Sequence, residues 1–115
     1  MKQVIDAYDF GHIVVNGKRY ASDVIVYPDR VQASWWRKEG HRLSPEDIKA
    51  VVEARPEVVV VGTGNPGLMR VPTETEELLR SRGIELVVQP TKDACRTFNL
   101  LSSTKRVVAA LHLTC

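Results

Sequence analysis

Four consecutive valines at residues 58–61 constrain the fold of this chain more than any other feature of its sequence. A run that is apolar at every position has no polar face, so it predicts a strand covered on both sides, as in a parallel sheet. Residues 107–113 are apolar on both faces in the same way and predict a second strand at the centre of that sheet. A third strand is expected at residues 84–88, where it forms a parallel, right-handed βαβ unit with the valine run.

Three segments before and between these strands have the pattern of amphipathic helices. The first follows Ser44, the expected N-cap, and ends before Pro56. The second spans residues 73–82 and is expected on the outside of the sheet. The third is expected over residues 91–101, with Thr91 as its N-cap. The alternation of helices and strands predicts the α/β class.

The first third of the chain predicts β hairpins. Asn16-Gly17 separates the β-prone residues 12–15 and 18–20, and both turn residues accept a positive φ. A second hairpin is expected to join residues 23–27 to residues 31–36. We therefore expect an α/β fold with a single three-layer domain, a central mixed sheet with βαβ units, and an N-terminal β-hairpin layer.

Length and composition agree with one globular domain over residues 1–115. The formal net charge of +2 is weaker than a nucleic-acid-binding domain usually carries, so nucleic acid is an unlikely partner. No apolar run approaches the roughly 18 residues of a membrane-spanning helix, and no membrane insertion is expected. The chain begins without a secretory signal, and Cys95 and Cys115 have no disulfide-framework spacing, so a cytoplasmic location is expected.

The loop after the valine run is the leading candidate for a ligand site. Residues 62–67 match G-x-G-x-x-G, but prolines and an irregular segment stand where a dinucleotide fingerprint requires a helix. A structural turn is one interpretation of this loop, and a small-anion pocket made by loop amides and a helix N-terminus is another. The candidate anion-binding residues are Gly62, Thr63, Gly64, Asn65, Thr91, Asn99 and Arg106. No nucleotide or other cofactor is predicted.

A catalytic or metal centre is not predicted. Cys95 falls in the first turns of the third expected helix, where a thiol pKa can be lowered, although burial as a small hydrophobe is the simpler interpretation. The three histidines are too dispersed for a metal site, and no spacing ties one of them to Cys95. Catalysis is therefore left open, with a non-enzymatic role favoured.

Trp35 and Trp36 are candidate interface residues. Neighbouring strand residues point to opposite faces, so one tryptophan is expected in the core and the other at the surface. An exposed tryptophan next to Arg37 and Lys38 resembles a base-stacking site, but it marks a protein interface at least as readily.

Taken together, these motifs resemble the uncharacterised Mth-type domain family. The residues that carry the resemblance are Tyr27-Pro28, Trp35-Trp36, Leu43, residues 60–64, Thr91, Ala94-Cys95, residues 97–100, Arg106-Val107 and residues 109–112. The resemblance implies a three-layer α/β fold around a mixed sheet and no established enzyme activity. Its relatives include assembly factor 3 of the mitochondrial NADH:ubiquinone oxidoreductase complex and the adipogenesis-associated Mth-domain-containing protein.

Two functions follow from these observations. The first is a non-catalytic binding or assembly-helper module that contacts protein partners, with a homodimer as a possibility and a link to respiratory complex I biogenesis implied by the resemblance. The second is a binder of a small anionic ligand, or an enzyme acting on one, at the Gly62-Thr63-Gly64 loop and the helix starting at Thr91. We favour the first, because the sequence holds no convergent acid, base and nucleophile.

Overall fold

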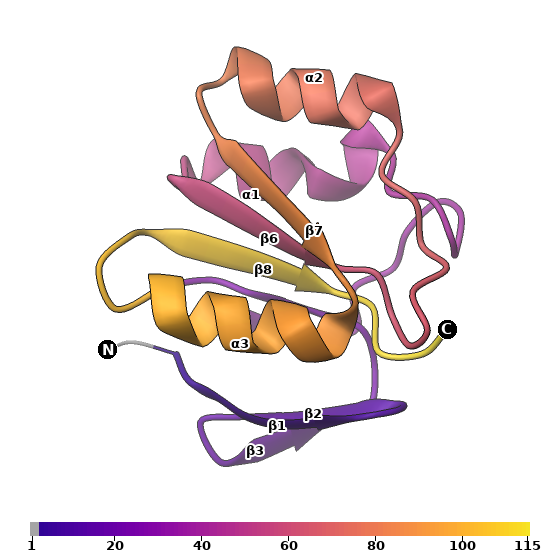
Figure 1. Cartoon of the computed structure of the whole chain (residues 1–115), viewed down its shortest axis with the longest axis vertical. Coiled ribbons are helices and arrows are strands. Elements are labelled where there is room, and N and C mark those ends of the chain that lie inside the picture. The colour runs from indigo at the N-terminus through magenta and orange to yellow at the C-terminus, as the bar shows by residue number, and fades with distance from the viewer. Residues whose placement is uncertain (1–2) are drawn as a thin grey trace.

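The computed structural model describes residues 3–115 and contains two sheets and three α-helices (Figure 1). The central sheet has the spatial order β5 (Val31–Gln32), β4 (Val24–Val26), β8 (Val107–Leu111), β6 (Val58–Gly62) and β7 (Glu85–Gln89). The smaller sheet contains β1 (Ile5–Asp9), β2 (His12–Val15) and β3 (Lys18–Tyr20). The helices are α1 (Lys49–Glu53), α2 (Thr73–Ser81) and α3 (Thr91–Leu101), and a 3-10 turn, η1 (Pro45–Ile48), precedes α1.

The valine run forms the middle of the parallel part of the central sheet. Strand β6 pairs in parallel with β7 on one side and with β8 on the other, so that Val58 faces both Glu85 and Val107. Every residue of β6 and β8 is buried. Each buried valine contributes about 1.5–3 kcal/mol relative to an exposed one. The prediction of strands covered on both faces is confirmed.

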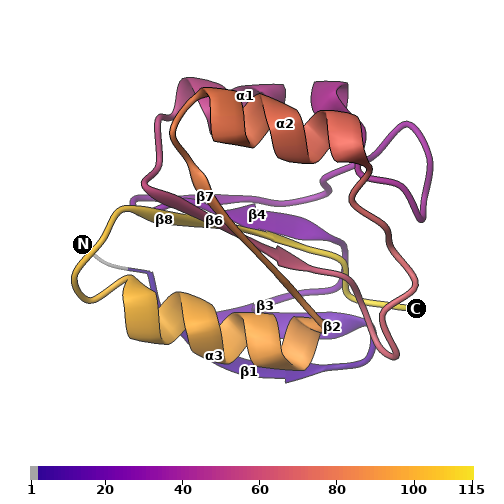
Figure 2. The same cartoon turned by 45° about the horizontal axis from the view of Figure 1, so that its top comes forward.

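Helices cover one face of this sheet, and α3 and the smaller sheet together cover the other (Figure 2). Val59 and Val61 pack toward α1 and α2, in a core that includes Leu79. Val58 and Val60 pack toward α3 and the smaller sheet, in a core that includes Phe98. The three-layer α/β arrangement is as expected. Within residues 3–115, no helix is long and apolar enough to cross a membrane.

The second expected hairpin is shorter than predicted and belongs to a different layer. Strands β4 and β5 pair with each other, but β4 also pairs with β8 and is therefore part of the central sheet. Only the first hairpin, together with β1, forms the separate layer. The prediction of a strand over residues 31–36 is wrong beyond Gln32, because Ser34 has a positive φ of 53° that ends the extended backbone.

The helix starts also differ in detail from the predictions. Ser44 is the N-cap of a 3-10 turn, and its N–H donates to Asp47 Oδ2 at 2.8 Å. Pro72 is the N-cap of α2, and Pro90, not Thr91, is the N-cap of α3. The hydroxyl group of Thr91 bonds instead to Gly64 and His112.

Candidate functional site

Strands β6 and β7 end side by side, and the chain leaves them toward opposite faces of the sheet. Val61 pairs directly with Val88, so the two strand ends lie next to each other. The segment after β6 leads to α2 on one face, whereas the segment after β7 leads to α3 on the other (Figure 2). Open α/β sheets bind ligands in the crevice at such a divergence. This corner is therefore the first place to look for a site.

The amides of the glycine loop are already used within the protein. Thr63 N–H donates to the carbonyl of Gln89 at 2.9 Å, and Asn65 N–H donates to the carbonyl of Thr114 at 2.9 Å. Gly64 N–H donates to Thr91 Oγ1 at 2.8 Å. The expectation of free amides is wrong at these positions, because acceptors at the end of β7, at the start of α3 and near the C-terminus already take these N–H groups.

Thr91 joins three segments through its hydroxyl group. Its Oγ1 accepts the bond from Gly64 and donates to the carbonyl of His112 at 2.5 Å. The glycines permit this close contact: a Cβ atom on Gly62 would lie 2.8 Å from Thr91 Oγ1, and one on Gly64 would lie 2.2 Å from the carbonyl of Thr114. Gly64 also has a φ of +104°. The G-x-G pattern thus has a packing explanation.

Two of the candidate anion-binding residues lie elsewhere. The Asn99 side chain accepts a hydrogen bond from the N–H of Ile5 and donates one to its carbonyl, at 2.9 and 2.8 Å, which ties α3 to β1. Arg106 precedes β8, at the other end of the parallel strands, where its guanidinium lies 3.6 Å from Glu57. The structure therefore brings Gly62, Thr63, Gly64, Asn65 and Thr91 together but not Asn99 or Arg106.

A crevice of about 720 Å³ lies beside this loop, outside the ends of β6 and β7. Its lining includes Thr63 and Val88 at the strand ends and the first turn of α2. The charged and basic lining residues are His41, Arg42, Arg70 and Glu76. Arg42 is ion-paired with Glu74, whereas Arg70 forms no ion pair with any residue in 3–115. Arg70 is thus the available cation of the crevice.

A buried ionic network, which the sequence did not predict, holds the C-terminal segment. Asp23 Oδ2 lies 2.8 Å from both Arg37 Nη1 and His112 Nδ1, and Asp23 Oδ1 accepts a hydrogen bond from Leu113 N–H at 2.8 Å. Burial acts to raise the pKa of Asp23, but hydrogen bonds from His112, Leu113 and Arg37 outweigh it and lower this pKa below its usual value. Asp23 is therefore a carboxylate at neutral pH.

His112 follows β8 and is buried. Its Nδ1 lies 2.8 Å from Asp23 Oδ2 and 3.0 Å from Arg37 Nη2, and the tautomer decides whether it donates to the carboxylate or accepts from the guanidinium. Nε2 is buried without a hydrogen-bond partner among residues 3–115. The ring packs edge-on against His41, at 5.8 Å between centroids, and Cys115 Sγ lies 4.0 Å from His41 Nε2. Asp23 and His112 are 89 positions apart, so no local pattern could have linked them.

Cys95 is not activated by its position in α3. Burial raises the pKa of its thiol to about 12, which counts against the interpretation as a reactive thiol. The burial of Cys95 confirms its interpretation as a small hydrophobe. In the part of the chain that the structure describes, no group of three or more His, Cys, Asp or Glu side chains could hold a metal ion.

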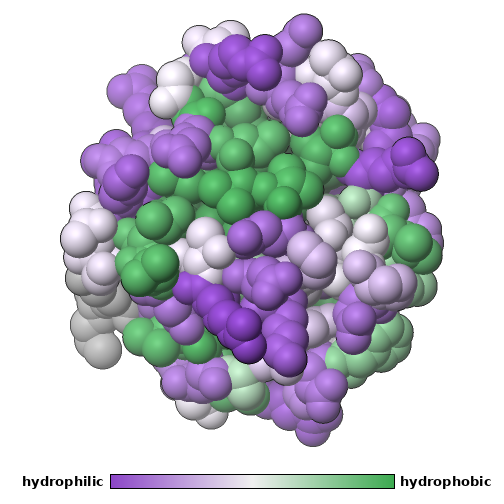
Figure 3. All heavy atoms as spheres, viewed as in Figure 1, coloured by the Kyte–Doolittle hydropathy of each residue, from purple (hydrophilic) through white to green (hydrophobic). Residues whose placement is uncertain are grey.

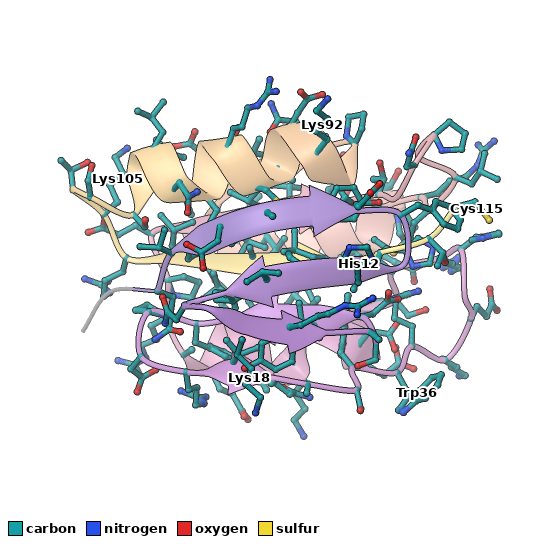
Figure 4. All side chains as sticks on the ribbon, turned by 90° about the horizontal axis from the view of Figure 1, so that it is seen from below. His12, Lys18, Trp36, Lys92, Lys105 and Cys115 are labelled. Atoms are coloured by element: carbon teal, nitrogen blue, oxygen red, sulfur yellow. The ribbon has the colours of Figure 1, made fainter. Side chains whose placement is uncertain are left out.

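The two tryptophans have opposite environments, as expected. Trp35 is buried, and its Nε1 donates to the carbonyl of Asp47 at 3.1 Å. Trp36 is 83% exposed and points away from the ribbon (Figure 4). Only Trp36 is thus available for contact with another molecule.

A second exposed apolar surface lies over β7, between α2 and α3 (Figure 3). Val88 is 44% exposed, and Leu86 and Val87 are partly buried. Contiguous apolar surfaces of this kind mark interaction sites.

Comparison with known proteins identifies a family model that matches this chain and solved structures that share its fold. A family model described as "Protein of unknown function (DUF498/DUF598)" matches residues 5–112. A conserved hypothetical protein from Pyrococcus horikoshii OT3 superposes with a TM-score of 0.84 at 28% identity, over 100% of both chains. A Bordetella pertussis protein described as a Mth938-like domain superposes with a TM-score of 0.68 at 26% identity, over 96% of this chain and 85% of that one.

The chain is also similar to curated proteins with an assigned role. Human "NADH dehydrogenase [ubiquinone] 1 alpha subcomplex assembly factor 3" is 35% identical over 109 residues, which cover 92% of this chain. The match spans 58% of the human protein's length.

Proposed function

This chain belongs to the DUF498/DUF598 family, and from that premise we propose that it is a non-catalytic binding module that helps other proteins to assemble. The observation that carries the proposal is the 35% identity to an assembly factor over 92% of this chain. A link to the biogenesis of respiratory complex I is the finer form of the proposal. It rests on the relative's name alone.

Two surfaces support contact with protein partners. Trp36 is largely exposed, and tryptophan is enriched among the residues that dominate protein interfaces. The apolar surface over β7 is the second (Figure 3). The family relationship makes protein the favoured partner over nucleic acid, and pairing of two copies is a further possibility.

A cytoplasmic location is supported by the two cysteines, which are both free thiols.

The test is removal of this chain from the cells that produce it. We expect less assembled NADH:ubiquinone oxidoreductase on native gels of the membranes, while the individual subunits are still synthesised. Re-expression of the wild-type chain should restore the complex. A normal amount of assembled complex in the deletion strain would contradict the link to complex I.

Binding of a small anionic ligand is the second candidate function. The observation that favours it is the crevice of about 720 Å³ with Arg70 on its wall. A thermal-shift panel of phosphates, nucleotides and carboxylates tests it, since a ligand at 100 times its Kd adds about 2.7 kcal/mol. A shift that is lost in Arg70→Ala would support this function, and a flat panel would count against it.

A further inference from the structure

Strand β7 has a backbone edge that the rest of the chain leaves open. It pairs only with β6, in parallel and in register from Glu85 to Gln89. Glu85 N–H donates to the carbonyl of Glu57, and the carbonyl of Gln89 accepts from Thr63 N–H, so both residues direct their backbone groups toward β6. Because strand residues alternate in this direction, Leu86 and Val88 direct their N–H and C=O groups away from the sheet.

Among the sheets formed by residues 3–115, the other strand edges are protected, and that of β7 is not. Strand β5, at the opposite edge of the central sheet, has only two residues. Strand β3 carries Lys18 and Arg19, and β1 has a bulge between Ile5 and Ala7. Short length, charge and bulges all discourage strand pairing. Strand β7 has five residues, an apolar middle, a regular register, and no lysine, arginine or proline. Its one charged residue, Glu85, lies at its first position, where the backbone faces β6.

We infer that β7 accepts an extended segment of a protein partner as a sixth strand of the central sheet, and this inference rests on the proposed function. The outward N–H and C=O groups of Leu86 and Val88 supply the backbone hydrogen bonds, as in other cases of strand addition. The apolar surface over β7 then receives apolar side chains at alternate positions of the partner.

The unpaired arginine of the adjoining crevice indicates which residue type the partner segment carries at one further position. Opposed residues on paired strands point to the same face. The partner residue opposite Pro90 therefore points to the α2 side of the sheet, as Val88 does, where both line the crevice that contains Arg70. Arg70 has no ion-pair partner within residues 3–115, and neither has Glu76, which also lines the crevice, so an acid is favoured only at the position next to Arg70. The segment that fits carries an acidic residue at this end.

A second copy of the chain fits this edge less well. Antiparallel self-pairing of Leu86 with Val88 would place Ile84 of the second copy opposite Pro90. Ile84 is apolar and already buried at 7% exposure, so Arg70 would remain unpaired. The unpaired Arg70 therefore favours a partner segment with an acidic residue beside it.

The experiment is selection of phage-displayed random 12-residue peptides on the immobilised full chain. Enriched peptides should alternate apolar residues and carry an acid at one end. Val88→Pro removes an outward N–H without touching the bonds to β6, and it should weaken these peptides at least tenfold. Arg70→Glu should weaken them about fivefold, and replacing the peptide's acid by lysine should restore binding to that variant. Leu100→Lys is the matched control, because Leu100 is a 74% exposed apolar residue on α3, and it should change affinity less than twofold.

Several outcomes would overturn the inference. These are failure to enrich any such peptide, full affinity of the enriched peptides for Val88→Pro, or a dimer in sedimentation that Val88→Pro dissociates. The denaturation midpoint of Val88→Pro checks that the variant is folded. The deletion strain separates the two proposals: an assembly defect without peptide binding at β7 refutes only the strand addition, whereas peptide binding without an assembly defect refutes only the assembly role.

Discussion

The glycine loop at residues 62–65 and the outer edge of β7 lie at the same corner of the central sheet but use their backbone in opposite ways. The loop amides of Thr63, Gly64 and Asn65 all bond to the chain's own acceptors. The backbone groups of Leu86 and Val88 point outward from the sheet edge. The glycine loop, which has the sequence pattern of a ligand site, uses its amides to hold the protein together. Strand β7, which has no such pattern, has the backbone N–H and C=O groups that remain free to bind.

Gly64→Val tests the packing of the glycine loop and has the largest expected effect on stability. A Cβ atom would collide with the carbonyl of Thr114 at 2.2 Å, so the variant should lose about 4 kcal/mol or more. Gly11→Ala is the control, because Gly11 also has a positive φ but has no atom within 4 Å of its Cβ position. It should lose only about 1 kcal/mol. Urea denaturation measures both, and equal losses would remove the packing explanation.

Asp23→Ala extends the test to the network that holds the C-terminal segment. Removing the carboxylate leaves Arg37 and His112 buried without their partner, which should cost about 3 kcal/mol at pH 7. Asp29→Ala removes an exposed ion pair with Arg30 and should change stability by less than about 0.5 kcal/mol.

The stability difference between wild type and Asp23→Ala should also depend on pH, in a direction set by the pKa of Asp23. The pKa of Asp23 is lower in the folded chain than its usual value of 3.8, so its stabilisation is present above that value and disappears as pH falls through the folded pKa. The advantage of wild type over Asp23→Ala should therefore shrink below about pH 4. Denaturation midpoints from pH 7 to pH 2 measure it, and an unchanged difference would show that the charge is not responsible.

Thr91→Val should have an intermediate effect, because it removes one hydroxyl but preserves the shape. Gly64 N–H and the carbonyl of His112 would both lose a partner, at a cost of about 2 kcal/mol. Thr91→Ser keeps the hydroxyl and should retain most of the stability. Chemical denaturation distinguishes the two, and similar losses would mean that the methyl group matters more than the hydrogen bonds.

Val88→Pro should have the smallest effect on stability, under about 1 kcal/mol, because the lost N–H faces outward. Val87→Pro one position earlier would remove an N–H directed to β6 and should cost about 3 kcal/mol or more. These two neighbouring substitutions test most directly which backbone groups of β7 face outward. If Val88→Pro were the more damaging variant, the outward direction assigned to its backbone would be wrong.

The sequence predicted the elements of the fold better than their relationships. The valine run and the apolar residues 107–113 identified the buried strands because their burial leaves a direct hydrophobic pattern. The end of β5 was missed because the positive φ of Ser34 has no signal in residue type. Trp36 could be proposed from the period of two, which does not by itself select the exposed tryptophan.

The site was harder to predict because it depends on spatial neighbours. Thr91 was correctly placed at the start of α3, but its hydroxyl bonds to Gly64 and His112, which are 27 and 21 positions away. The position of β7 at the sheet edge follows from the strand order, and the parallel pairing alone would equally allow it in the centre. Asn99 and Arg106 were grouped with the loop by residue chemistry, and only the topology separates them.

The pairing of β4 with β8 also sets the order in which this chain can fold as it is made. Val24 pairs with Leu111, and the Asn99 side chain holds Ile5, so the N-terminal strands depend on partners near the other end of the sequence. Ribosomes deliver the N-terminal strands first, and long-range pairings of this kind form slowly. The apolar residues Ile13 and Val15 must therefore wait, without their final neighbours, until almost the whole chain has emerged from the exit tunnel.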